Sequence, residues 1–157
     1  KLSEENDKIK FVGNVLKPLN FIKNLDILVV PSIREPLGIV SIEAGLCKIP
    51  VIASNTDGIP EVITNNRSGI LINPTKRITL KQYKGQPPLP DFVINPDTHK
   101  MIKPKELDPK ILSNRILFLS KNKKLRIEYG NQLYQDVKKK FSIKGYFAKV
   151  EEIYKQI

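Results

Sequence analysis

The sequence predicts an α/β fold built from βαβ units around a parallel sheet, and three consecutive segments carry that prediction. Ile27–Val30 is a continuous run of aliphatic, mostly β-branched residues that ends at Pro31-Ser32, which is typical of a strand covered on both faces. Gly38–Cys47 follows with apolar residues at helical spacing, and Val51–Ala53 is again a short β-branched run. A strand, a helix and a second strand in this order indicate a parallel pair.

Two elements are predicted ahead of this unit. Lys8–Val12 alternates polar and apolar residues and stops at Gly13-Asn14, so we expect a short strand there. Pro18 then opens a segment in which Leu19, Ile22 and Leu25 recur at helical spacing, and we expect a helix that begins at this proline.

The βαβ pattern continues after the second strand. Asn55–Gly58 has the composition of a loop, and the following Ile-Pro-Glu-Val-Ile predicts a short helix with Pro60 in its first turn. Gly69–Ile72 is the next predicted strand. The chain up to this point is therefore predicted to alternate strands and helices.

Residues 75–109 break the pattern, because they hold half of the twelve prolines and no sustained period. We interpret them as an inserted basic, proline-rich loop, with a hairpin formed by Phe92–Ile94 and Lys100–Ile102. A solvated loop is the commoner fate of such a segment, and a contact surface is the alternative. His99, the only histidine, lies in this segment, away from the motif described below, and is expected to be exposed rather than catalytic.

Residues 110–157 are predicted to be helical to the end of the chain, with polar faces rich in lysine. Three apolar stripes support this prediction. Their members are Ile111, Leu112, Ile116 and Leu119; Leu125, Ile127, Leu133 and Val137; and Phe147, Val150, Ile153 and Tyr154.

The bulk composition limits the classes of function. The chain has 157 residues, 40% apolar content and a net charge of +11, which suits one domain attracted to polyanions, anionic membranes or phosphorylated ligands. No aromatic-basic motif or known recognition helix accompanies the charge, so we expect no nucleic-acid binding. One cysteine, Cys47, excludes an internal disulfide and any cysteine-cluster metal site. Without a leader or a long apolar run, we expect a soluble or peripheral protein.

The stretch Arg34–Gly45, REPLGIVSIEAG, has the composition of an anion-binding turn. A helix that begins near Gly38 would direct its free backbone amides toward the mouth of the sheet, and such amides bind anions with help from the helix dipole. The amides of Gly38, Ile39 and Val40 are therefore candidate donors to a diphosphate.

Two acids lie on either side of this turn. Glu43, beyond the first helical turn, is placed to accept hydrogen bonds from vicinal sugar hydroxyls, and Glu35 could reach a group attached to the distal phosphate. The pair suits a nucleotide-linked sugar. The alternative is that Glu35 is a solvated loop residue and Glu43 an ordinary surface acid.

The run VVPSIREPLGIVSIEAGLCKIPVIASNTDGIPEVI, from Val29 to Ile63, resembles the C-terminal nucleotide-sugar domain of retaining GT-B glycosyltransferases of family 4. In that family a strand ending in Pro-Ser leads into two glutamates separated by seven residues, a helix, a Pro-Val-Ile-Ala strand and a Gly-Ile-Pro-Glu loop. The resemblance implies a Rossmann-like parallel sheet. Residues 8–24 and the terminal FSIKGYFAKVEEIYKQI also resemble parts of the family's domain.

By that resemblance Glu35 is the expected catalytic residue, in contact with the donor sugar, and Glu43 binds the ribose hydroxyls. The amides of Gly38, Ile39 and Val40 hold the diphosphate, Val15 touches the base, and Leu37 and Gly58 complete the donor site. The resemblance implies no metal ion and no cofactor beyond the donor, so amides and positive side chains would stabilise the leaving diphosphate.

Departures from the family pattern are also visible. Lys48 stands where the family often has glycine; if this position is a left-handed C-cap, the substitution costs about 1 kcal/mol. Asp57 replaces the first glycine of the usual pair, and either selects a group of the donor sugar or merely ends the loop. The first strands and their basic pair, and the acceptor domain, are absent, so residues 1–157 would form a partial, incomplete nucleotide-sugar-binding domain.

The resemblance implies a retaining hexosyltransferase that moves a sugar from a nucleotide diphosphate, with UDP expected, to a glycan or lipid-linked acceptor. The pathway would be synthesis of a bacterial surface polysaccharide such as O-antigen or capsule. The expected location is cytoplasmic, with peripheral contact to an anionic membrane, and the missing N-terminal domain is an expected partner. The alternatives are a nucleotide-sugar-binding module without catalysis and a storage-glucan synthase-type enzyme.

Overall fold

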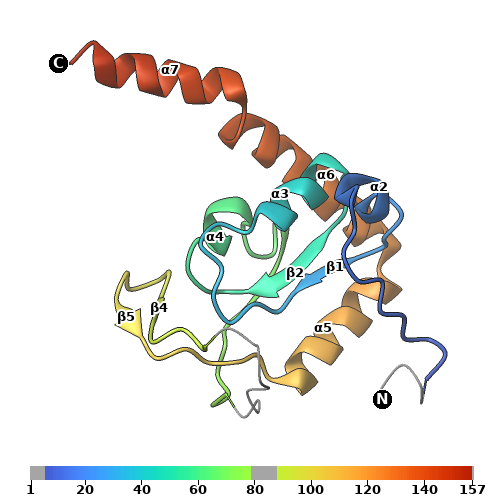
Figure 1. The fold of residues 1–157 in the computed structure, drawn as a ribbon. Coiled ribbons are helices and arrows are strands. Elements are labelled where there is room, and N and C mark those ends of the chain that lie inside the picture. The colour runs from blue at the N-terminus through green and yellow to red at the C-terminus, as the bar shows by residue number, and fades with distance from the viewer. Residues whose placement is uncertain (1–5, 79–87, 157) are drawn as a thin grey trace.

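The computed structural model describes residues 6–78 and 88–156, and these form an α/β arrangement of helices around a parallel sheet (Figure 1). The strands β1 (Leu28–Val30), β2 (Val51–Ser54) and β3 (Gly69–Ile72) are parallel and lie in the order β1-β2-β3. Val29 pairs with Ile52, and Ile52 with Ile70. This is the order in which strands four, five and six of a Rossmann sheet lie.

Helices cover both faces of the sheet, as the β-branched composition of its strands predicts. Alternate residues of β2 point to opposite faces, so Val51 and Ala53 lie in one core cluster and Ile52 in the other. The first cluster also contains residues from α3 (Ile39–Leu46), from α4 (Ile59–Val62) and from the end of α6 (Lys123–Lys140). The second cluster also contains residues from α5 (Pro109–Lys121) and from the middle of α6.

The helix α6 joins the two clusters, because its apolar residues reach both faces of the sheet. Leu133 and Val137 belong to the first cluster, and Tyr129 belongs to the second. The Nζ atom of Lys140, at the last turn of α6, donates to the carbonyl oxygen of Glu61 in α4 at 3.0 Å. These contacts hold α3 and α4 against one face of the sheet.

The predicted strand at Lys8–Val12 is wrong. Residues 8–17 form no helix or strand, and Phe11 and Val12 are 76% and 56% exposed. Among the described residues no strand pairs with this segment or with the outer edge of β1, so its alternating pattern has no ladder to join. The following helix is confirmed as α2 (Pro18–Ile22), with the proline at its first position.

The predicted hairpin is confirmed. The strands β4 (Val93–Ile94) and β5 (Met101–Ile102) are antiparallel, with Val93 opposite Ile102, and they form a separate two-stranded sheet beside the loops of the main one (Figure 1). Val93 is buried at 3% exposure. Residues 79–87 of the predicted insertion lie outside the described residues.

The C-terminal helices are confirmed, but their predicted stripes are only partly buried. Ile111 and Ile127 are 40% and 55% exposed, because each lies on the side of its helix that faces away from the clusters. The last helix, α7 (Ile143–Tyr154), has no buried residue and projects away from the body of the molecule (Figure 1). Its apolar stripe therefore forms a helix face, but not a core contact among the described residues.

Candidate functional site

The candidate site lies at the carboxyl ends of the parallel strands, where open α/β sheets bind ligands. Two loops meet there. Residues 31–38 connect β1 to α3, and residues 55–58 connect β2 to α4. Gly38 ends the first loop in a left-handed conformation with φ of 85°, which suits glycine, and the chain enters α3 from there.

The first turn of α3 leaves two backbone amides free. The Ser41 amide donates to the Gly38 carbonyl at 2.8 Å, and the Gly38 amide donates to Oε1 of Glu35 at 3.2 Å. Ile39 and Val40 have no acceptor for their N–H groups within residues 6–78 and 88–156. These two free amides at the positive end of the helix dipole are suited to an anion.

Glu35 is folded back onto the same helix start. Besides the Gly38 amide, its carboxylate accepts from the Ser32 hydroxyl, at 3.5 Å between Oγ and Oε2. The side chain is half-buried. A carboxylate has about four acceptor positions, so these two bonds leave room for a ligand hydroxyl. The Gly38 amide, expected to be a diphosphate donor, is committed to Glu35 in this structure.

Glu43 lies one turn further along α3, four residues after Ile39 and hence on the same face of the helix. It is half-buried, and in the described part of the chain its carboxylate has no hydrogen bond or ion pair. The Glu43 carboxylate thus has unused acceptor positions one helical turn after the two free amides. The vicinal hydroxyls of a nucleotide could donate hydrogen bonds to it.

The other predicted donor-site residues differ in their surroundings. Leu37 and Val40 pack half-buried against the first core cluster, whereas the Ile39 side chain is 66% exposed. Val15 is half-buried in the segment before α2, outside both clusters, and its contact with a base stays a prediction. Of this group, the free amides of Ile39 and Val40 belong directly to the candidate anion site.

Gly58 brings the two loops into contact. A Cβ atom at this position would lie 1.9 Å from the carbonyl oxygen of Pro36, and the Gly58 amide donates to the carbonyl of Glu35 at 3.2 Å. Only glycine allows this approach. The role of Gly58 shown by the structure is thus to hold the loop that carries Glu35, and a direct contact with donor stays a prediction.

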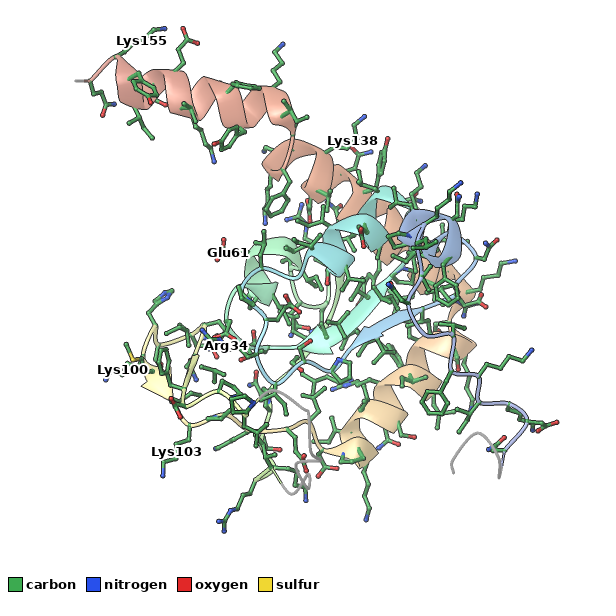
Figure 2. All side chains as sticks on the ribbon, viewed as in Figure 1. Arg34, Glu61, Lys100, Lys103, Lys138 and Lys155 are labelled. Carbon is green, nitrogen blue, oxygen red and sulfur yellow. The ribbon has the colours of Figure 1, made fainter. Side chains whose placement is uncertain are left out.

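A cavity of about 460 Å³ opens between the two loops, α4 and the hairpin. Its charged and titratable lining residues are Arg34, Asp57, Glu61 and His99. The Arg34 guanidinium carbon lies 5.7 Å from the centre of the Phe92 ring, and Figure 2 shows Arg34 between the sheet loops and the hairpin. Sequence reasoning missed Arg34 and Glu61 and set His99 apart from the motif. Docking of the hairpin is a tertiary event with no local signal.

Neither a metal cluster nor a membrane-spanning helix is found within residues 6–78 and 88–156. No group of three or more His, Cys, Asp or Glu side chains there could hold a metal ion. None of the helices in the same residues combines the length and the apolar character that crossing a bilayer requires.

The model of the family "Glycosyl transferases group 1" matches residues 2–84, a little over half of the chain, and this range contains Glu35, Glu43 and both loops.

Among curated proteins, the chain is 49% identical to alpha-maltose-1-phosphate synthase of Mycolicibacterium smegmatis over 47 residues, 30% of this chain and 12% of the relative. It is 32% identical to the capsular polysaccharide biosynthesis glycosyltransferase CapM of Staphylococcus aureus over 68 residues, 43% of this chain and 18% of the relative. The matches thus span less than a fifth of these relatives.

Among solved structures, the Anabaena protein HepE in complex with UDP-glucose is similar in fold. The TM-score is 0.69 with 18% identity, and the match covers 97% of this chain and 33% of HepE. At that identity the likeness concerns the fold. It confirms the expected fold, an incomplete Rossmann-like domain.

Proposed function

The chain belongs to the glycosyl transferases group 1 family, and from this premise we propose that it is the donor-binding part of a sugar transferase. The observation that carries the proposal is the pair of free amides, Ile39 and Val40, with the unpaired Glu43 carboxylate one turn below them. Amides at a helix start favour a diphosphate, and a carboxylate favours the hydroxyls of its ribose.

The donor of this proposal is a nucleotide diphosphate sugar, with UDP as the nucleotide. Glu43 binds the ribose, the α3 amides bind the diphosphate, and Glu35 contacts the sugar from the loop before the helix. The UDP-glucose in the HepE structure supports UDP as the first nucleotide to test. No metal ion takes part in this scheme, and the α3 amides and nearby cations stabilise the leaving diphosphate.

The reaction proposed for the full-length protein is transfer of a hexose with retention to a growing glycan or lipid-linked oligosaccharide of a bacterial surface polysaccharide. The similarity to a capsular glycosyltransferase supports this pathway. The chain matches one third of HepE, so we assign the acceptor site to the rest of the protein, an N-terminal domain outside this chain. We expect the 157 residues alone to bind donor without turnover.

Calorimetric titration of UDP, GDP and UDP-glucose into the chain tests the proposal. We expect saturable binding of UDP and UDP-glucose, and a loss of about tenfold or more in affinity for Glu43→Ala, because hydrogen bonds to a charged group contribute about 1.5 to 3 kcal/mol. Glu128→Ala is the matched control, since Glu128 is an exposed acid on α6 away from the site. Equal affinities of both variants, or no nucleotide binding by the parent chain, would reject the proposal.

A further inference from the structure

Asp57 lies where the two site loops and the hairpin meet, and its backbone is left-handed with φ of 44°. Both oxygens of its carboxylate accept backbone amides. The amide of Glu35 donates to Oδ2 at 3.0 Å, and the amide of Ile94, in β4, donates to Oδ1 at 2.7 Å. One side chain thus joins residues that are 22 positions before it and 37 positions after it.

The backbone adds two bonds to this junction. The Asp57 amide donates to the Ile94 carbonyl at 3.0 Å, and the Gly58 amide donates to the Glu35 carbonyl at 3.2 Å. Glu35 and Ile94 are both half-buried, so an amide that lost the carboxylate would be poorly solvated. The hydrogen bonds to Asp57 therefore attach both the hairpin and the Glu35 loop to one residue.

The structure gives Asp57 a role beyond the two expected from the sequence. A residue that merely ends a loop needs no side-chain acceptor, and selection of a sugar group stays a prediction, because a carboxylate with two hydrogen bonds keeps further acceptor positions. Here each oxygen already has a charge-assisted hydrogen bond to the backbone. The carboxylate therefore acts on protein segments.

We propose that Asp57 is a positioning residue that clamps the Glu35 loop to the β4–β5 hairpin, making the hairpin a wall at the sugar end of the donor site. The cavity supports this arrangement, because Arg34 and Asp57 line it from the two loops, and Ile94, Pro96 and His99 line it from the hairpin. The inference rests on the proposed function for its ligand, and on the hydrogen bonds alone for the clamp itself.

The clamp predicts separate effects on the two ends of the donor. The free amides of α3 and the Glu43 carboxylate have no hydrogen bond with Asp57, so we expect binding of UDP to be independent of it. The Glu35 amide is one of the two donors to the Asp57 carboxylate. Loss of Asp57 therefore releases the Glu35 loop, and we expect the sugar of the donor to contribute no further affinity.

The first measurement is residue-resolved amide hydrogen exchange by NMR on Asp57→Gly, Asp57→Asn and the parent chain. Glycine keeps the left-handed backbone and removes both acceptors, so we expect the Glu35 and Ile94 amides to exchange at least about tenfold faster, which corresponds to about 1.4 kcal/mol. An asparagine side chain has one oxygen, so Asp57→Asn loses protection at only one of the two amides. If Asp57→Gly does not fold, the Asp57→Asn variant tests the clamp in its place.

Asn66→Gly is the matched control, since Asn66 also has a left-handed backbone, with φ of 57°, is exposed and does not line the cavity. It should leave the exchange at Glu35 and Ile94 unchanged. Unchanged protection of both amides in Asp57→Gly would overturn the clamp.

The second measurement compares the affinities for UDP and UDP-glucose in the same variants. We expect Asp57→Gly to bind UDP within about twofold of the parent and to lose the preference for UDP-glucose over UDP. An equal loss for both ligands, or a preference that survives in Asp57→Gly or is absent in the parent, would overturn the positioning role. No UDP binding by the parent would reject the proposed function, and hydrogen exchange would still decide the clamp.

Discussion

At the scale of single residues, Lys48 shows what the structure adds to a departure from a family pattern. The sequence left open whether this position is a left-handed C-cap, and the structure shows that it is, with φ of 59°. The Ile49 amide donates to the Ala44 carbonyl at 2.9 Å and the Lys48 amide to the Gly45 carbonyl at 3.0 Å, which is the Schellman pattern. The end of α3 therefore forms normally without glycine, and the lysine carries the backbone strain.

Replacing Lys48 tests this strain. Lys48→Gly should be more stable than Lys48→Ala by about 1 kcal/mol, because alanine keeps a Cβ atom in the left-handed region. Both variants lose the contact of Lys48 with the Tyr134 ring, 5.1 Å from Nζ to the centroid, so the comparison isolates the backbone. Urea unfolding measures the difference. Equal free energies of unfolding would show that the C-cap is unstrained.

At the scale of elements, the start of α5 depends on Asp108. Its carboxylate accepts the Lys110 amide at 2.9 Å, and Oδ2 lies 3.2 Å from the Nζ atom of Lys76. The Lys110 amide, followed by Lys76, lowers the pKa of Asp108 below the ordinary value of 3.8. The folded state therefore binds this proton less readily than the unfolded state, and ionised Asp108 stabilises the fold.

The sign of this shift predicts the pH dependence of stability. The contribution of Asp108 is fully present above its unfolded pKa, near 3.8, and is lost as the pH falls through the lower pKa of the folded state. Asp108→Asn keeps an N-cap acceptor without the charge, so its free energy of unfolding should fall less than that of the parent below pH 3.8. Urea unfolding across this range measures it.

Asp7→Asn is the control for that experiment, because Asp7 is exposed and has no hydrogen bond or ion pair within the described residues. It should leave the pH dependence as in the parent chain. If Asp108→Asn follows the same curve as the parent, the N-cap carboxylate does not contribute to stability through its ionisation.

The helix α7 illustrates what a local pattern leaves open. Its stripe predicts an amphipathic helix, and the helix is present, with Ser142 as its N-cap, whose hydroxyl accepts the Gly145 amide at 3.1 Å. Phe147 and Tyr154 are nevertheless 63% and 73% exposed. The pattern predicts that such a face exists, but it does not say what covers it.

At the scale of the whole molecule, the net charge of +11 is the dominant feature. Lys138, Lys139 and Lys140 end α6, and Lys144 and Lys149 follow on α7, next to the exposed apolar face. Figure 2 shows Lys138 near the base of α7 and Lys155 at its far end. We propose that this end of the molecule contacts anionic lipid on the cytoplasmic face of the membrane.

Vesicle flotation tests this contact. We expect the chain to float with vesicles that contain anionic lipid and not with neutral ones, and to be released by salt. Replacing Lys144 and Lys149 by glutamine should weaken flotation, since each basic residue near such a surface contributes about 1 kcal/mol. The same change at Lys110 and Lys121 of α5 is the control. Flotation that ignores anionic lipid would contradict the proposal.

The sequence predicted most elements because their signals are local. The β-branched runs of β1, β2 and β3, the proline at the start of α2 and the apolar spacing of α3 each act within a few residues. The prediction at Lys8–Val12 failed because a strand needs a partner, and its pattern does not say whether one is present. The stripes that contain Ile111 and Ile127 predicted helices correctly, but not which of their residues are buried, because helical spacing does not say which side a neighbour covers.

By itself the sequence determined the order of the strands and helices and the acids on either side of the α3 turn, because these follow from local spacing. Only the tertiary structure decided that the Gly38 amide is taken by Glu35 and that Asp57 joins the Glu35 loop to the hairpin. Those bonds join segments far apart in the chain or depend on side-chain direction, and both are settled only when the elements pack together.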